Sequence, residues 1–109
     1  IGFWDTSNVT FMYALFKNSN SFNQYIGDWD ISKVINTAGV FDGASAFNQD
    51  IGNWNTSKVI KMRRTFRGST TFNQDLTGWC VTNIITEPSQ FLFNAPIEGK
   101  NNPAWGTCL

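Results

Sequence analysis

The densest group of chemically active side chains in this 109-residue sequence is basic. Five of the eight Lys and Arg residues fall close together, and no Asp or Glu occurs between Ile51 and Gln74. They are Lys58, Lys61, Arg63, Arg64 and Arg67. Concentrated positive charge binds anionic groups, such as those of an acidic glycan or an acidic protein segment, but many charge runs are only solvated faces. We predict an anion-binding patch here, with a solvated face as the alternative.

Two pairs of carboxylates recur at a fixed distance along the chain, Asp5 with Asp30 and Asp50 with Asp75. Carboxylates on adjacent layers could perform acid-base chemistry, as in glycan hydrolysis, or hold a calcium ion. An Asp at a bend more often caps its own turn. The sequence has no His, so the usual base for a Ser or Cys nucleophile is missing. We therefore expect no enzyme, no catalytic residue, no cofactor and no metal site.

The two cysteines, Cys80 and Cys108, both lie in the last third of the chain. They have no C-x-x-C spacing and no His beside them, which makes a metal site a poor interpretation. We predict a disulfide, which persists only in an oxidising compartment. Two buried free thiols in a cytosolic protein are the alternative.

The chain repeats with a 25-residue period, and this repeat must position all of these side chains. Four apolar or amide columns recur at that spacing, and we expect them to form ladders. Their members are Trp4, Trp29, Trp54 and Trp79; Phe16, Phe41, Phe66 and Phe91; Val9, Val34, Val59 and Ile84; and Asn23, Asn48 and Asn73. Repeats of about 20 to 50 residues are typical of stacked units that bury their apolar faces only against neighbours.

The pattern within one repeat predicts its secondary structure. Alternation of Phe22, Gln24 and Ile26 has the period of a short strand. The four-residue spacing from Met12 to Phe16 suits a single helical turn. We therefore predict a repeat solenoid of about four 25-residue coils, each with short β-strands and one short helical turn.

The Asn-Gln pairs allow two interpretations. An Asn at a fixed bend can bond the backbone of its own coil and of the next, which is a structural role. The alternative is a row of amides that binds sugar, for which Gln24, Gln49 and Gln74 are the more exposed candidates.

The repeat divides the chain into residues 1–79, the stacked coils, and residues 80–109, a capping unit. Pro88, Pro96 and Pro103 and the expected disulfide would stiffen this cap. The chain starts without Met and three positions before a Trp, so we expect a truncated or uncapped N-terminal edge. Eight basic and eight acidic residues cancel, and no apolar run is long enough to span a bilayer, so we expect neither nucleic acid binding nor membrane insertion.

The segment Phe-Asn-Gln-Asp-Ile-Gly-Asn-Trp-Asn-Thr-Ser-Lys-Val at residues 47–59, with its copies at Phe22 and Phe72, resembles the BspA-type repeats of the DUF285 class. That class contains bacterial cell-surface proteins and lipoproteins. The ending, with Glu87-Pro88 and Trp105-Gly106-Thr107-Cys108, is similar to caps of its secreted members. The resemblance implies a leucine-rich-repeat-like solenoid outside the cell, used for adhesion or for binding host or matrix components. It transfers no catalytic residue.

We expect a secreted or surface-exposed module that binds protein or glycan through a rigid face. The alternative is a structural protein that self-assembles end to end or edge to edge through its N-terminal edge, into dimers or filaments. Ice binding would need a flat Thr array, and the column Thr6, Ile31, Thr56 and Val81 is too mixed for it.

Overall fold

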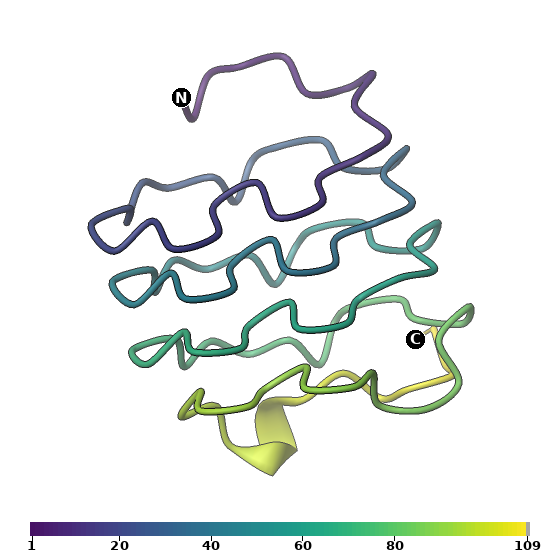
Figure 1. The fold of residues 1–109 in the computed structure, drawn as a ribbon. Helices are drawn as coiled ribbons and strands as arrows, with labels where there is room; N and C mark the ends of the chain where they lie inside the picture. The colour runs from purple at the N-terminus through teal and green to yellow at the C-terminus, as the bar shows by residue number, and fades with distance from the viewer. Residues whose placement is uncertain (109) are drawn as a thin grey trace.

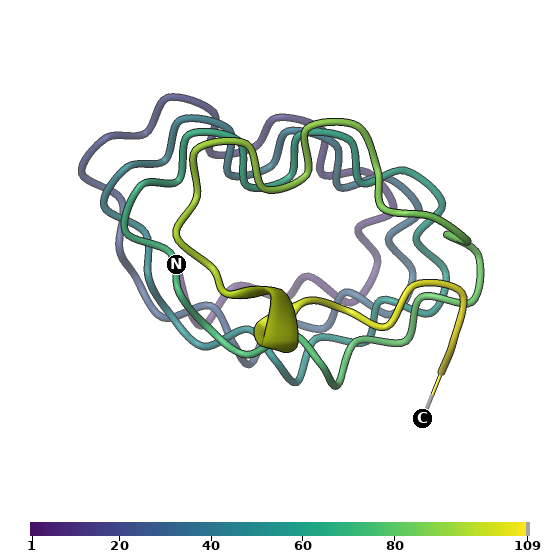
Figure 2. The ribbon, with the colours of Figure 1, turned by 90° about the horizontal axis from the view of Figure 1, so that it is seen from below.

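The computed structural model describes residues 1–108, in which the chain winds repeatedly around a common interior (Figure 1). We call the successive passages winding 1 (residues 1–25), winding 2 (26–50), winding 3 (51–75) and winding 4 (76–108). Seen from the end, they overlie one another (Figure 2). Leu109, the last residue of the predicted capping unit, lies outside the described residues.

The predicted leucine-rich-repeat-like solenoid of short β-strands and helical turns is wrong. Residues 1–108 contain no strand and no sheet, and their one helix is η1, a 3₁₀ helix at Gly99–Asn101. Phe11 with Asn36 and Asn36 with Lys61 form isolated parallel bridges. The chain is instead a compact body of consecutive turns, with a radius of gyration of 12.4 Å, close to the roughly 13 Å of a compact domain of this length.

Strands are absent from this part of the chain because neighbouring peptide groups bond in different directions. In winding 1 the amides of Ala14 and Phe16 donate to Ala38 and Val40 of the next winding. The amides of Leu15, Lys17 and Ser19, which alternate with them, donate to carbonyls three residues earlier. Every second bond thus closes a turn, and no run of ladder bonds builds up.

The predicted helical turns fail because of one backbone torsion. Ala14, between Met12 and Phe16, has φ of 54°, and the equivalent Gly39 and Arg64 have φ of 66° and 58°. A residue in the left-handed region interrupts a right-handed helix and also a strand. The four-residue apolar spacing therefore comes from a pair of tight turns.

The core is a set of stacked aromatic rings. Phe16, Phe41 and Phe66 stack from winding to winding with centroids 5.9 and 5.5 Å apart. A second stack beside it consists of Phe22, Phe47 and Phe72, with spacings of 5.7 and 5.9 Å. Within winding 2, Phe41 and Phe47 lie 4.2 Å apart and are fully buried. These contacts hold the windings in register through dispersion and apolar burial.

The tryptophans add a hydrogen bond to each junction. The indole N–H of Trp29, Trp54 and Trp79 donates to the carbonyl 28 residues earlier, at distances of 3.1, 3.0 and 2.9 Å. Trp4 stacks on Trp29, and Trp54 on Trp79. An apolar ring whose one polar atom is satisfied by the neighbouring winding suits an interior between layers.

The register slips by one residue between windings 3 and 4. The left-handed residues keep the period of the repeat from Ala14 to Gly39 to Arg64, but the next is Gln90, one position beyond that period. Phe41 donates its amide to Thr65, whereas its equivalent Phe66 donates to Phe91, which lies one position beyond the equivalent of Thr65. The extra residue lies between Ile85 and Pro88.

This slip removes Phe91 from the predicted ladder of phenylalanines. The ring of Phe91 meets Phe66 edge-on, at 88°, where the preceding rings are nearly parallel. Trp105 in turn meets Phe91 edge-on, with centroids 4.9 Å apart. Winding 4 thus ends the parallel stack and covers it with perpendicular rings.

The predicted disulfide is confirmed, since Cys80 and Cys108 are bonded. It ties the end of the described chain to the start of winding 4. Nearby, the amides of Val81 and Thr107 donate to the carbonyls of Thr107 and Ala104 respectively. In residues 1–108, no helix has the length and apolar character needed to cross a membrane.

Candidate functional site

Two adjoining hollows lie side by side on one face of the windings, with volumes of about 440 and 70 Å³. Tyr13, Ala38 and Arg63 line both of them. The larger hollow adds Asn36, Ile60, Lys61, Met62, Ile84 and Pro88. The smaller adds Ala14, Lys17, Gly39, Asp42 and Arg64. We call the two together the basic groove.

The groove follows from residue sizes within one column of the repeat. Ala38 of winding 2 occupies the position that Tyr13 has in winding 1 and Arg63 in winding 3. A small side chain between two large ones leaves a depression, and Tyr13 is 60% exposed beside it. Asn36, buried at the floor, accepts a hydrogen bond at Oδ1 from the amide of Ala38 at 2.8 Å.

The predicted basic patch is divided by the structure. Lys61, Arg63 and Arg64 line the groove, whereas Lys58 and Arg67 do not. Lys17 of winding 1 joins them, although it lies far from them in sequence. The predicted patch contains only residues that are close in sequence. The 25-residue period, which places Lys17 on the same face of the chain, is the feature of the sequence that could have added it.

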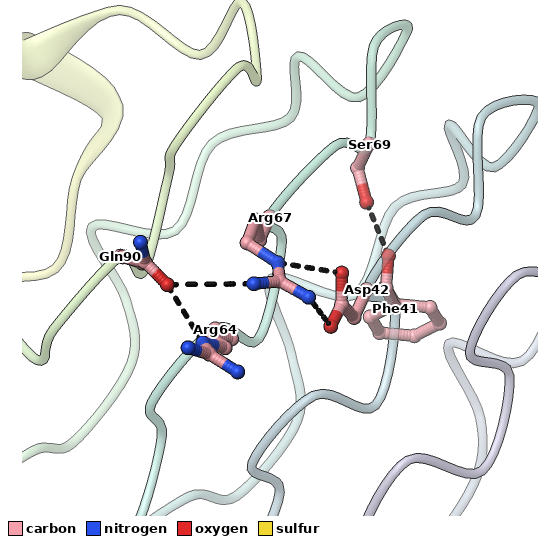
Figure 3. A network of polar contacts seen from close by, with 6 residues as sticks. All are labelled: Phe41, Asp42, Arg64, Arg67, Ser69 and Gln90. Atoms are coloured by element: carbon pink, nitrogen blue, oxygen red, sulfur yellow. Dashed lines mark hydrogen bonds and ion pairs between the residues drawn. The ribbon is translucent and has the colours of Figure 1, made fainter.

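Arg67 has a structural partner. Its guanidinium donates two hydrogen bonds to the carboxylate of Asp42, at 2.9 and 2.8 Å (Figure 3). These hydrogen bonds and the charge of Asp42 raise the pKa of Arg67 above its ordinary value. The pair joins windings 2 and 3, and it also neutralises Asp42, the one carboxylate among residues 1–108 that lines the groove.

Arg64 is hydrogen-bonded to winding 4. Its Nε donates to Oε1 of Gln90 at 2.6 Å, and the same oxygen lies 3.5 Å from a nitrogen of Arg67 (Figure 3). The backbone of Arg64 is left-handed, at a position where winding 2 has Gly39. This conformation is unfavourable for a residue with a β-carbon.

The remaining cations of the groove form no ion pair within residues 1–108. Two ion pairs occur in residues 1–108, Arg67 with Asp42 and Lys100 with Glu98. Neither includes Lys17, Lys61, Arg63 or Arg64. The groove therefore has a local excess of positive charge in a chain whose formal net charge is zero.

An apolar stripe runs beside the groove. Ile35, Ile60 and Ile85 occupy one column of the repeat and are 43%, 54% and 79% exposed. Ile60 also lines the larger hollow. Exposed aliphatic side chains next to unpaired cations form a surface that is both apolar and charged, which is common where proteins bind partners.

The amide columns make bonds between windings. Asn23 and Asn48 accept at Oδ1 from the backbone amides of Asn48 and Asn73, each at 2.9 Å. Gln49 and Gln74 donate to the carbonyls of the same two Asn residues, at 3.0 and 2.9 Å. Gln49 and Gln74 are predicted to be the more exposed candidates for sugar binding, but they are only half-buried beside exposed Asn48 and Asn73, and they hold the windings together. Gln24, the third candidate, is exposed.

The carboxylate columns form turns within single windings. Asp5, Asp30 and Asp75 each accept from the backbone amide and the hydroxyl two residues later. Hydrogen bonds from the hydroxyls, and then from the amides, lower the pKa of all three. Asp50 accepts the amide of Gly52 in the same way. Nowhere in residues 1–108 do three His, Cys, Asp or Glu side chains gather in a group that could hold a metal ion.

The mixed Thr column points inward. Thr6, Ile31, Thr56 and Val81 are all buried. The hydroxyls of Thr6 and Thr56 donate to the carbonyls of Asp30 and Cys80 in the next winding. This column therefore offers no surface to ice.

A comparison with protein families matches residues 1–105 to a family described as "Mycoplasma protein of unknown function, DUF285". No curated protein and no solved structure matches the chain.

Proposed function

The chain belongs to the DUF285 family, whose description gives no activity, and we propose from its surface that it is a non-enzymatic interaction module. It binds an anionic protein or glycan through the basic groove, outside the cell or on the bacterial surface. The observation that carries this proposal is a set of cations around one concave surface that form no ion pair within residues 1–108, namely Lys17, Lys61, Arg63 and Arg64.

The setting of these cations supports binding. Asp42, the carboxylate at the groove, is already engaged by Arg67, so it does not cancel the field of the others. Tyr13 and Ile60 add apolar contact area to the same hollow. Charges of one sign around a concave surface raise the local concentration of oppositely charged ligand and speed association.

The rigidity of the surroundings supports recognition without rearrangement. Stacked rings and backbone bonds join windings 1, 2 and 3, whose residues supply most of the groove. A binding surface that is already formed loses less conformational entropy when a partner binds. The Cys80–Cys108 bond favours an oxidising location such as the outside of the cell.

The experiment is a binding array of acidic glycans, matrix proteins and acidic peptides. It compares the natural chain with a variant that carries Lys61→Gln, Arg63→Gln and Arg64→Gln. The matched control carries Lys33→Gln, Lys58→Gln and Lys100→Gln, which remove the same charge from outside the groove. We expect binding to be lost in the first variant and kept in the second. Equal binding by both would overturn the proposal.

Self-assembly is a second candidate, supported by the apolar side chains that winding 1 exposes. Phe3, Trp4 and Phe11 all lie on the surface, and Phe3 is fully exposed. Burial of such a surface against a second copy would be favourable. Sedimentation across a hundredfold range of concentration tests this candidate, and a constant monomer mass would exclude it.

A further inference from the structure

The backbone hydrogen bonds between windings at the basic groove indicate what class of partner it can bind. Two backbone bonds join winding 1 to winding 2 at this face: the amide of Ile35 donates to Thr10, and that of Met12 donates to Asn36. Windings 2 and 3 are joined equivalently, by bonds from Ile60 to Ile35 and from Thr37 to Lys61. All four distances are 2.9 or 3.0 Å.

The same bonds are missing between windings 3 and 4. At the 25-residue spacing, the carbonyl of Ile60 corresponds to that of Ile35, and the amide of Met62 corresponds to that of Thr37. In winding 2 these two groups form the hydrogen bonds to winding 3. Among residues 1–108, neither group makes a hydrogen bond to the backbone or to a side chain, and neither does the amide of Ile85. The bridges stop at Lys61 for the same reason.

The register slip explains the gap. The extra residue between Ile85 and Pro88 displaces winding 4 from the path that its predecessors take past residue 60. Bonding between the windings resumes only where the amide of Arg64 donates to Ser89, at 3.1 Å. The larger hollow opens here, and Ile60, Met62, Ile84 and Pro88 all line it.

The acceptor belongs to Ile60, which is largely exposed, and the donor to Met62, which is buried but lines the larger hollow. These two groups form the short edge to which an extended chain can pair. The equivalent groups of winding 2 already pair with a parallel segment, winding 3, so their direction is suited to it. Addition of a peptide to such an edge gives affinity through main-chain bonds, and neighbouring side chains supply specificity. A glycan has no matching alternation of N–H and C=O groups, and within residues 1–108 Tyr13 is the one aromatic residue that lines the hollows.

The side chains around this edge indicate the charge of the peptide. Lys61 and Arg63 flank Met62 in sequence, and Lys17 and Arg64 line the adjoining hollow. We infer that the partner is an extended acidic segment of another polypeptide, which pairs with the backbone of residues 60–62 in the gap between windings 3 and 4. This inference rests on the proposed function and names its ligand class.

The test uses a defined probe, an end-capped octapeptide that alternates Glu and Val. Two further peptides carry N-methyl groups on the Glu residues or on the Val residues, so that one set of backbone donors is removed at a time. A sulfated oligosaccharide is the fourth ligand. Affinity is measured by calorimetry, and hydrogen exchange at the Met62 amide is followed by NMR.

We expect the unmodified peptide to bind, one of the methylated peptides to bind at least tenfold more weakly, and the Met62 amide to exchange more slowly in the complex. The variant with Lys61→Gln and Arg63→Gln should also bind more weakly, and its thermal unfolding verifies that it is folded. If both methylated peptides bind as tightly as the unmodified one and exchange at the Met62 amide is unchanged, strand pairing is wrong but the proposed function stands. Binding of the oligosaccharide alone has the same meaning. If neither ligand binds, the inference and the proposed function are both wrong.

Discussion

Arg67 and Asp42 form a two-point ion pair between windings 2 and 3, with N–O distances of 2.9 and 2.8 Å. Two parallel bonds of this kind give a carboxylate and a guanidinium a defined orientation. Arg67 is therefore part of the framework, whereas Arg63, four residues earlier, has no ionic partner in residues 1–108 and lines both hollows. Neighbouring charges of one cluster thus have different roles.

This difference predicts different effects for two variants. Replacement of the whole pair, by Arg67→Gln with Asp42→Asn, should lower the midpoint of thermal unfolding, because the contact between windings 2 and 3 is lost. It should change binding of the acidic octapeptide little, because the net charge of the groove is unchanged. Arg63→Gln should weaken peptide binding and leave the unfolding midpoint within a degree or two. Thermal unfolding followed by circular dichroism, together with peptide titration, measures both. If both variants lose the same amount of stability and the same amount of peptide affinity, the division into a structural and a binding arginine is wrong.

Trp54→Phe should destabilise the chain. The substitution removes the indole N–H that bonds the carbonyl of Ile26, which then keeps only the amide of Trp29 as a donor within residues 1–108. The loss of one such hydrogen bond costs about 0.5–1.5 kcal/mol. Trp4→Phe is the control, because the indole of Trp4 is exposed and donates no hydrogen bond in the part of the chain that the structure describes. Urea unfolding gives both free energies, and a loss for Trp4→Phe as large as for Trp54→Phe would argue against this bond.

The amide ladder predicts a contrast within one column. Asn48→Ala removes the acceptor of the Asn73 amide and of Gln74, and should lower stability by about 1 kcal/mol. Asn73→Ala should have little effect, because the side chain of Asn73 makes no hydrogen bond within residues 1–108 and winding 4 departs from the ladder. Urea unfolding of the two variants side by side checks this, and equal losses would show that the ladder bonds are not responsible.

Stability should decrease in acid through the capped turns. The pKa values of Asp5, Asp30 and Asp75 are lowered in the folded chain from an ordinary value of 3.8. Above that value these carboxylates are ionised in both states, so their contribution is complete. It is lost as the pH falls below that ordinary value toward the folded-state values, because the unfolded chain takes up protons first.

A variant with all three Asp residues replaced by Asn tests whether these carboxylates cause the loss of stability in acid. Asn keeps the turn, since Asn55 already accepts the amide of Ser57 at 3.1 Å in winding 3. The unfolding temperature of the variant should decrease less between pH 5 and pH 2.5, roughly the range over which such carboxylates titrate. A decrease as large as in the natural chain would assign the acid sensitivity to other groups.

Reduction of the disulfide should destabilise the last winding. Cys80 and Cys108 are 28 residues apart, and closure of such a loop contributes about 3–4 kcal/mol on the chain-entropy model. The midpoint of guanidinium unfolding should therefore fall when a reductant is added. Cys80→Ser with Cys108→Ser should already unfold at the lower midpoint and should not respond to the reductant.

Several properties could be predicted from the sequence because they depend on composition and period alone. The regular recurrence of Trp29, Trp54 and Trp79 requires equivalent environments, and the structure gives each indole the same bond. An isolated pair of cysteines predicts its own disulfide, which is present. The clustering of Lys61, Arg63 and Arg64 predicts that positive charge gathers in one place, whatever the backbone does, because these residues are neighbours in the chain.

The rest was decided by tertiary structure, because it depends on torsions and on contacts between windings. The spacing from Met12 to Phe16 suits a helical turn, but the left-handed torsion of Ala14, held by bonds to the next winding, excludes one. The period of the repeat puts Phe91 in a ladder, yet with one extra residue before Pro88 its ring lies at 88° to that of Phe66, and the backbone groups at residues 60 and 62 are left without bonds to winding 4. The partner of Arg67 lies in the preceding winding, so only the stacking of windings determines that its charge is neutralised while that of Arg63 stays available.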